Sequence, residues 1–154
     1  MLFLVVYMND IYINENFSGS SESGPDREYQ AYLGEGRFMI QRSRGSGRYI
    51  FYPRIAEPGT GHTDLEWVEA SGSGTVYAVT VVRPRPPRSA YNVVLVDLAE
   101  GPRMMSRVEG IEPEAVEIGM SVRARIVRGE EGWYVVFDPE QLSNQQNQGG
   151  SLPS

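Results

Sequence analysis

Residues 71–82 have the sequence SGSGTVYAVTVV, and this stretch begins the part of the chain that decides the fold. Glycine and serine alternate at a tight turn, and a run of β-branched and small residues typical of a strand follows. Tyr91–Leu98 and Arg103–Val108 are two further runs of this kind. Ser121–Val127 alternates apolar and charged residues, and Trp133–Phe137 is a last apolar run. These patterns predict five strands in the second half of the chain.

A single helical turn is expected at Glu112–Val116, where Gly119 closes the segment. Five strands with a short helix between the third and the fourth have the element order of an OB-fold barrel. Gly72 and Gly74, at the head of the first strand, suit the coiling of such a barrel. The sequence therefore predicts a mainly β protein with an OB-fold domain at residues 71–139.

The segment before the barrel predicts a helix followed by a hairpin. Asp26 is expected to cap the helix, on which Tyr29, Tyr32 and Leu33 share one face. Three strands are expected after it: Arg37–Gln41, Arg48–Tyr52 and Leu65–Glu69. The first two flank a glycine-rich turn, which is typical of a hairpin. Residues 25–70 are therefore predicted to form a separate module.

Polar stretches predict tails at both ends, a flexible one at residues 1–24 and a disordered one at 140–154. The apolar start, Met1–Met8, has no basic region before it and no small-residue cleavage site after it, so we expect no signal peptide. It is expected to be a tail or to precede the true start at Met8. The sequence leaves open whether Met1–Tyr7 belongs to the native protein.

Composition excludes several classes of function. The chain has no cysteine, which excludes disulfides, thiol catalysis and cysteine-ligated metals. Its net charge is −6 and all 14 basic residues are arginine, an acidic balance that argues against general nucleic-acid binding. No stretch approaches the roughly 18 apolar residues of a membrane helix. We expect a cytoplasmic protein.

Several short stretches follow one another in a characteristic order. They are Gly36–Arg48 (GRFMIQRSRGSGR), Leu65–Glu69 (LEWVE), Gly72–Tyr77 (GSGTVY), Leu95–Leu98 (LVDL), Gly101–Arg103 (GPR) and Ile118–Arg123 (IGMSVR). On these motifs the chain resembles, from about Tyr29 to Pro139, the zinc-ribbon/OB-fold proteins of acyl-CoA metabolism, the domain-of-unknown-function-35 family. The resemblance implies a metal-free hairpin, similar to rubredoxin or a zinc ribbon, in front of the barrel.

The resemblance also implies a function. Such proteins are accessory subunits that associate with a thiolase-like enzyme, which performs a condensing or retro-aldol step in acyl-CoA, lipid or steroid metabolism. The chain is accordingly expected to be non-catalytic and to take a coenzyme A thioester as ligand. The sequence agrees that catalytic residues are lacking, since His62 is the only histidine and no serine lies in a G-x-S-x-G motif.

Four positions that resemble the zinc ligands of the family are degenerate here: Ser43, Ser46, Glu57 and Thr60. Neutral hydroxyls are poor zinc ligands, so we expect no zinc. Other contacts must then hold the hairpin. It carries large apolar side chains on both faces, and the barrel can cover only one face. The following residues are therefore expected to contact a partner: Phe38, Ile40, Tyr49 and Phe51.

The loop between the first two barrel strands, Arg83-Pro84-Arg85-Pro86-Pro87-Arg88, carries three arginines on a proline-stiffened segment. Guanidinium groups match phosphate oxygens, so the residues expected to bind the phosphates of coenzyme A are Arg83, Arg85 and Arg88. A partner-docking arm and an ordinary solvated loop are the alternatives.

An alternative function is single-stranded nucleic-acid binding, which OB barrels perform by stacking bases on aromatic side chains over a basic groove. The residues that would supply this surface are Tyr77, Tyr91, Trp133, Arg123 and Arg125. A stand-alone hydratase or transferase is a third possibility, but no acid/base pair supports it. The acidic composition and the resemblance both favour the accessory subunit.

Overall fold

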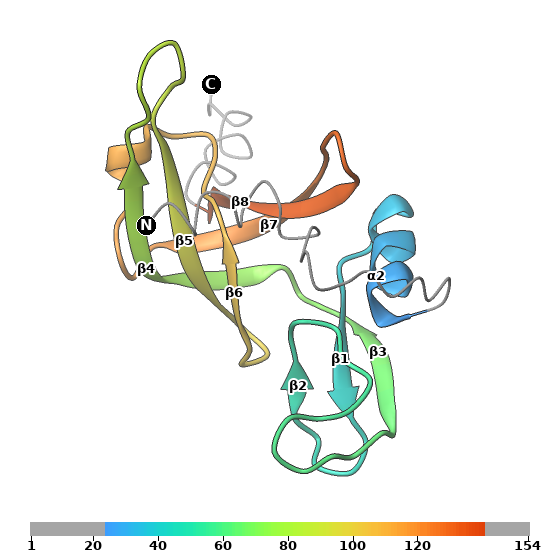
Figure 1. Ribbon diagram of the computed structural model, residues 1–154. Coiled ribbons are helices and arrows are strands. Elements are labelled where there is room, and N and C mark those ends of the chain that lie inside the picture. Colours follow the sequence, from blue (N-terminus) through green and yellow to red (C-terminus); the bar gives the residue numbers. More distant parts are fainter. Residues whose placement is uncertain (1–23, 141–154) are drawn as a thin grey trace, which may run out of the picture.

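The computed structural model describes residues 24–140 and consists mainly of β-strands (Figure 1). One helix, α2 (Pro25–Gly34), precedes a three-stranded sheet of β1 (Met39–Ser43), β2 (Tyr49–Ile50) and β3 (Leu65–Glu69). The second sheet contains β4 (Ser73–Val82), β5 (Tyr91–Leu98), β6 (Arg103–Ser106), β7 (Ser121–Arg128) and β8 (Trp133–Pro139). A 3-10 turn, η1 (Pro113–Ala115), lies between β6 and β7. The prediction of a mainly β, OB-like element order is confirmed.

The five-stranded sheet curls until its two edges meet. Its strands lie in the order β6-β5-β4-β7-β8, all antiparallel. The chain after β6 then pairs in parallel with β8 at Val108 and Phe137. The amide of Glu109 donates to the Phe137 carbonyl at 2.8 Å, and the amide of Phe137 donates to the Arg107 carbonyl at 3.0 Å. This single parallel bridge links the segment that follows β6 to β8, so the two edges of the curled sheet meet there.

Asn92 determines where β6 leaves its neighbour β5. Its buried side chain donates to the Val108 carbonyl and accepts from the Val108 amide, both at 2.8 Å. Val108 thereby satisfies its backbone groups on a side chain of β5 instead of on the β5 backbone. Because of this change of partner, β6 ends at Ser106 and not at Val108 as the sequence predicts.

Helix α2 begins differently from the expectation. Gly24 occupies the N-cap position without a side-chain bond, and Pro25 starts the helix. The predicted cap at Asp26 is wrong, because Asp26 lies inside the first turn, where burial raises the pKa of its carboxyl. Proline suits the first helical position, where no amide proton is needed.

The Gln30 side chain holds helix α2 against the barrel, because it bonds to both backbone groups of one residue as a paired strand would. Gln30 donates to the Trp133 carbonyl at 2.8 Å and accepts from the Trp133 amide at 2.9 Å, at the start of β8. Gly34 lets the helix approach closely, since a Cβ there would lie 3.2 Å from the Trp133 ring nitrogen. Figure 1 shows α2 at the β8 end of the barrel, with the three-stranded sheet below it.

The two sheets and the helix share one hydrophobic core. Its buried members are Tyr29, Leu33, Phe38, Ile40, Val76, Val94, Val96, Leu98, Met104, Val108, Val116, Val122, Val135 and Phe137. Core residues lie on both sides of the expected boundary between a module at residues 25–70 and a barrel at 71–139. The boundary itself stays a prediction. The expected tails lie outside the described residues, apart from Gly24 and Glu140.

The expected uncovered apolar face of the hairpin is not present. Phe38 is 6% exposed and Ile40 is 1% exposed, because both belong to the shared core beneath α2. Met39 and Ile50, on the other face, are buried too. Assigning Phe38 and Ile40 to a partner interface is therefore wrong for the chain as folded. The same assignment for Tyr49 and Phe51, which are half-buried, stays a prediction.

No helix in residues 24–140 combines the length and the apolar character that crossing a bilayer would require.

We predict that Gly74→Ala destabilises the barrel. A Cβ at Gly74 would lie 2.5 Å from Cγ1 of Val96 and 3.1 Å from the Asp97 carbonyl oxygen, so β5 would have to move. Overpacking of this kind costs about 1–3 kcal/mol in the free energy of unfolding. Urea denaturation checks the value, with Ser73→Ala as the neighbouring control. Equal stability of the two variants would contradict the close approach.

Candidate functional site

The four positions expected to be degenerate zinc ligands lie together in the structure. The Ser46 hydroxyl donates to Oε1 of Glu57 at 2.5 Å, and the Thr60 hydroxyl donates to Oε2 at 2.7 Å. The amide of Ser46 donates to the Ser43 hydroxyl at 3.3 Å. We call Ser43, Ser46, Glu57 and Thr60 the Glu57 cluster.

Two similar glycine turns position the Glu57 cluster. In the first, the Gly47 amide donates to the Ser43 carbonyl at 2.8 Å, and in the second the Gly61 amide donates to the Glu57 carbonyl at 3.0 Å. Gly47 and Gly61 have φ of 76° and 74°, in the left-handed region that favours glycine. Each turn therefore folds back on itself and directs its polar side chains toward the other turn.

The Glu57 carboxylate is buried and held in its charged form. Its residue is 3% exposed, and hydrogen bonds from Ser46 and then Thr60 lower the pKa of the carboxyl. Burial opposes this effect, while Ser43 and His62 add smaller contributions in the same direction as the main bonds. A buried carboxylate is tolerable only when such bonds replace its water.

The donor set does not fit a structural zinc ion. Three of the four positions offer neutral hydroxyls, and both oxygens of the fourth already accept hydrogen bonds. Within residues 24–140, no group of three or more histidine, cysteine, aspartate or glutamate side chains is placed to hold a metal.

The three arginines of the β4–β5 loop differ in their contacts. Arg83 forms an ion pair with Glu114 of η1, with 3.2 Å between Nη2 and Oε1. Arg85 and Arg88 are exposed, and the Arg88 amide donates to the Arg85 carbonyl at 3.3 Å. The loop lies at the end of the barrel away from α2 (Figure 1). Arg85 and Arg88 are therefore better placed than Arg83 to meet a ligand in solution.

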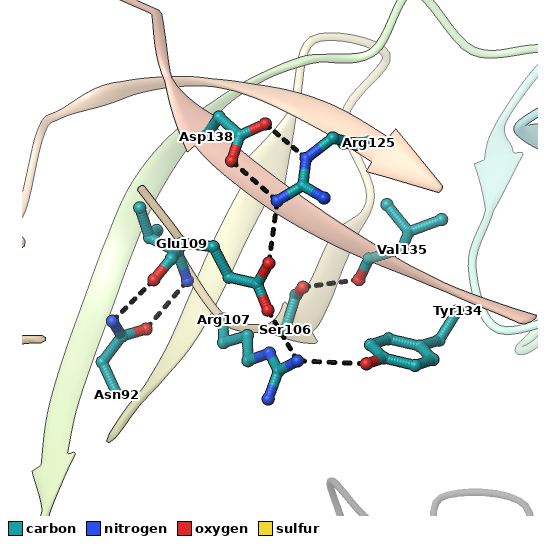
Figure 2. A network of polar contacts seen from close by, with 9 residues as sticks. Asn92, Ser106, Arg107, Glu109, Arg125, Tyr134, Val135 and Asp138 are labelled. Atoms are coloured by element: carbon teal, nitrogen blue, oxygen red, sulfur yellow. Dashed lines mark hydrogen bonds and ion pairs between the residues drawn. The ribbon is translucent and has the colours of Figure 1, made fainter. Parts of the chain in front are cut away.

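The arginines that would line a nucleic-acid surface form ion pairs with carboxylates. Arg125 makes a two-bond contact with Asp138, at 2.7 and 3.1 Å, and its Nη2 lies 2.7 Å from Glu109 (Figure 2). These bonds raise the pKa of Arg125. Arg123 lies 3.5 Å from Glu140. A groove whose cations are already paired has little charge to neutralise phosphates, which disfavours nucleic-acid binding.

The aromatic side chains of that alternative are also engaged. The Arg103 guanidinium lies 3.3 Å from the centroid of the Tyr77 ring, and Arg103 is itself bound to Asp97 at 2.6 Å. The Arg128 guanidinium lies 5.6 Å from the centroid of the Trp133 ring, and the Tyr91 hydroxyl is buried. Base stacking would have to displace Arg103 from Tyr77.

Sequence reasoning missed the acidic partners in Figure 2. Glu109 bridges Arg107, at 2.6 Å, and Arg125, while Tyr134 accepts from Arg107 at 3.0 Å. The sequence alone does not pair Glu109 and Asp138 with Arg125, because the three residues lie on different segments of the chain. The only available signal was alternation on β7, which puts Arg123 and Arg125 on one face.

Curled into a closed sheet and extended by a helix and a hairpin, the chain is an OB-fold protein. The family model "ChsH2, C-terminal OB-fold domain" matches residues 67–127. A solved structure described as "Ltp2-ChsH2(DUF35) aldolase" superposes with a TM-score of 0.66 at 31% identity, covering 77% of this chain and 97% of that one. The chain belongs to the DUF35 OB-fold family.

Curated relatives match over shorter stretches. A "DUF35 domain-containing scaffold protein" of Pyrococcus furiosus is 34% identical over 82 residues, which are 50% of this chain and 60% of that protein. A "Probable enoyl-CoA hydratase alpha subunit" of Thermomonospora curvata is 39% identical over 90 residues, 56% of this chain and 28% of that protein. The chain thus spans only part of the length of these curated relatives. A DUF35 structure from Sulfolobus solfataricus, 14% identical with a TM-score of 0.61, shares the fold.

We predict that the stabilising effect of Glu57 is lost in acid. The folded-state pKa lies below the ordinary value of 4.5, so the stabilisation is fully present above that value and disappears as pH falls through the folded pKa. The difference in free energy of unfolding between the wild type and Glu57→Gln should therefore shrink from about pH 7 to about pH 3. Denaturant titrations at each pH measure it. A difference that is constant over this range would contradict the prediction.

Proposed function

We propose that the chain is a non-catalytic subunit that associates with a thiolase-like enzyme of acyl-CoA or steroid metabolism. The observation that carries the proposal is the match to the "Ltp2-ChsH2(DUF35) aldolase" structure over nearly the whole of that chain. Curated relatives named scaffold proteins, and one named "3-oxo-4,17-pregnadiene-20-carboxyl-CoA hydratase alpha subunit" from Mycobacterium tuberculosis, support the same class. The acyl-CoA chemistry is then the task of the partner.

The side chains of the described part support a non-catalytic role. His62, the only histidine of the chain, is exposed on a turn, and its ring lies against Gly45. The acids Glu109 and Asp138 are ion-paired with Arg125, so their carboxylates are already occupied. Glu57 is enclosed by hydroxyls and is not open to a substrate.

The proposed ligand is the phosphate end of coenzyme A, at the β4–β5 loop. Arg85 and Arg88 are exposed and lie three residues apart on one turn, where guanidinium groups can bind phosphate oxygens through paired hydrogen bonds. Arg83 would have to leave Glu114 to join them. We therefore assign the main phosphate contacts to Arg85 and Arg88.

A proposed contact with the partner enzyme lies on the segment after β2. Gln41 donates to the Arg54 carbonyl at 2.8 Å and accepts from the Arg54 amide at 2.6 Å, so this segment is held in place. Ile55 follows directly and is 78% exposed. A large apolar side chain displayed on a fixed segment is typical of a binding anchor. Ile55 joins the half-buried Tyr49 and Phe51 as a proposed contact.

We predict a stable complex with a thiolase-like enzyme encoded beside this chain. Size-exclusion chromatography of the co-expressed pair should show co-elution, and the chain alone should not turn over acyl-CoA. Ile55→Ser should weaken the complex, whereas Ile118→Ser, at a side chain 69% exposed elsewhere, should not. Separate elution, or acyl-CoA turnover by the chain alone, would contradict the proposal. Equal effects of the two substitutions would contradict only the role of Ile55.

We also predict that the double variant Arg85→Ala/Arg88→Ala weakens coenzyme A binding to the complex. Loss of charge-assisted hydrogen bonds should cost about 1–3 kcal/mol, roughly a fivefold to 150-fold increase in Kd. Arg83→Ala should have a smaller effect because of its ion pair with Glu114. Isothermal titration calorimetry measures the change, with exposed Arg44→Ala in the hairpin as a charge control. An unchanged Kd would identify an ordinary solvated loop.

A further inference from the structure

The Glu57 cluster joins the β1–β2 turn to the turn that precedes β3, beside the point where Ser43 of β1 pairs with Leu65 of β3. Ser43 ends β1 and Ser46 lies in the turn after it, whereas Glu57 and Thr60 belong to the turn that precedes β3. We infer that the Glu57 carboxylate is the anionic centre of a metal-independent cross-link between these loops. The cross-link uses hydroxyl donors around an anion, where the family resemblance implies thiolates around a cation.

The hydrogen-bond directions carry this inference. The Ser46 hydroxyl gives its proton to Glu57 and accepts from the Arg48 amide at 3.2 Å. The Thr60 hydroxyl gives its proton to the other carboxylate oxygen and accepts from the His62 amide at 3.4 Å. Each hydroxyl therefore acts as donor and acceptor at once. Both Glu57 oxygens and the Ser46 and Thr60 hydroxyls thus have hydrogen-bond partners within the chain.

The backbone of the second loop supports the same arrangement. The Glu57 amide donates to the His62 carbonyl at 2.8 Å, so the residue that bears the carboxylate is also fixed through its main chain. The His62 ring packs on Gly45 of the first loop, where a Cβ would come within 3.2 Å of it. The two loops thus also meet at Gly45 and His62.

Charge and burial explain why such a link can replace a metal. Hydrogen bonds to an ionised acceptor are about twice as strong as neutral ones, and a low-dielectric setting strengthens them further. The same burial makes the carboxylate costly once a donor is removed. Loss of one hydroxyl should therefore loosen both loops and not only the one that carries it.

The test uses the full chain and compares Glu57→Gln, Ser46→Ala and their double variant. Each single change should lower Tm by roughly 5 °C or more, and the double variant should lose less than the sum, since both changes break one network. Exposed Glu69→Gln, on the neighbouring strand, is the matched control and should leave Tm unchanged. Hydrogen exchange at residues 43–48 and 57–62 should become about tenfold faster or more in Glu57→Gln.

Metal measurements complete the test. Chain purified from zinc-supplemented medium should contain no stoichiometric zinc, and chelator should leave its Tm unchanged. A full zinc equivalent whose removal lowers Tm would overturn the inference. Unchanged Tm and exchange rates in Glu57→Gln would overturn it as well.

A gain-of-metal variant tests the geometry independently. Ser43→Cys/Ser46→Cys/Glu57→Cys/Thr60→Cys should bind one zinc ion per chain and become chelator-sensitive, because the four positions converge on one point. A folded quadruple variant that binds no zinc would show that they do not converge, which would overturn the inferred cross-link. These outcomes are independent of partner binding, so the proposed function stands or fails separately.

Discussion

The pairing of Val108 with Phe137 is the constraint on which the rest of the structure depends. It closes a five-stranded sheet that would otherwise expose two edges, and Asn92 makes it possible by binding both backbone groups of Val108. Closure encloses the core around Phe137 and places the start of β8 at the barrel end. The Trp133 backbone is hydrogen-bonded there to the Gln30 side chain of α2. The closed barrel therefore sets the position of the helix and of the hairpin that follows it.

Ion pairs define the outer surface of the barrel. Arg125 joins Asp138 and Glu109, and Arg103 joins Asp97 while covering Tyr77. Exposed pairs of this kind contribute little to stability, but they occupy the cations that a nucleic acid would need. With a net charge of −6, the chain is suited to selective contacts and not to general polyanion binding. Arg85 and Arg88 stand out as exposed cations on one turn.

In the hairpin module, a carboxylate among hydroxyl donors holds two turns together, where the family resemblance implies thiolates around a metal cation. Two glycine turns face each other, and the Glu57 carboxylate collects hydroxyl protons from Ser46 and Thr60. A fixed segment next to this cluster displays Ile55, the side chain proposed to contact a partner. The proposed functions are thus divided, with the hairpin directed to protein contact and the β4–β5 loop to phosphate.

The sequence by itself determined the five barrel strands and their order along the chain, because alternating β-branched residues and glycine turns are local signals. The resemblance of its motifs to a known family identified Ser43, Ser46, Glu57 and Thr60 as related positions. Only the tertiary structure decided that Phe38 and Ile40 lie in the core, since apolar residues on both faces of a strand do not show which face is covered. It alone paired Arg125 with Glu109 and made Glu57 a hydrogen-bonded centre, because those partners meet only after distant segments have packed.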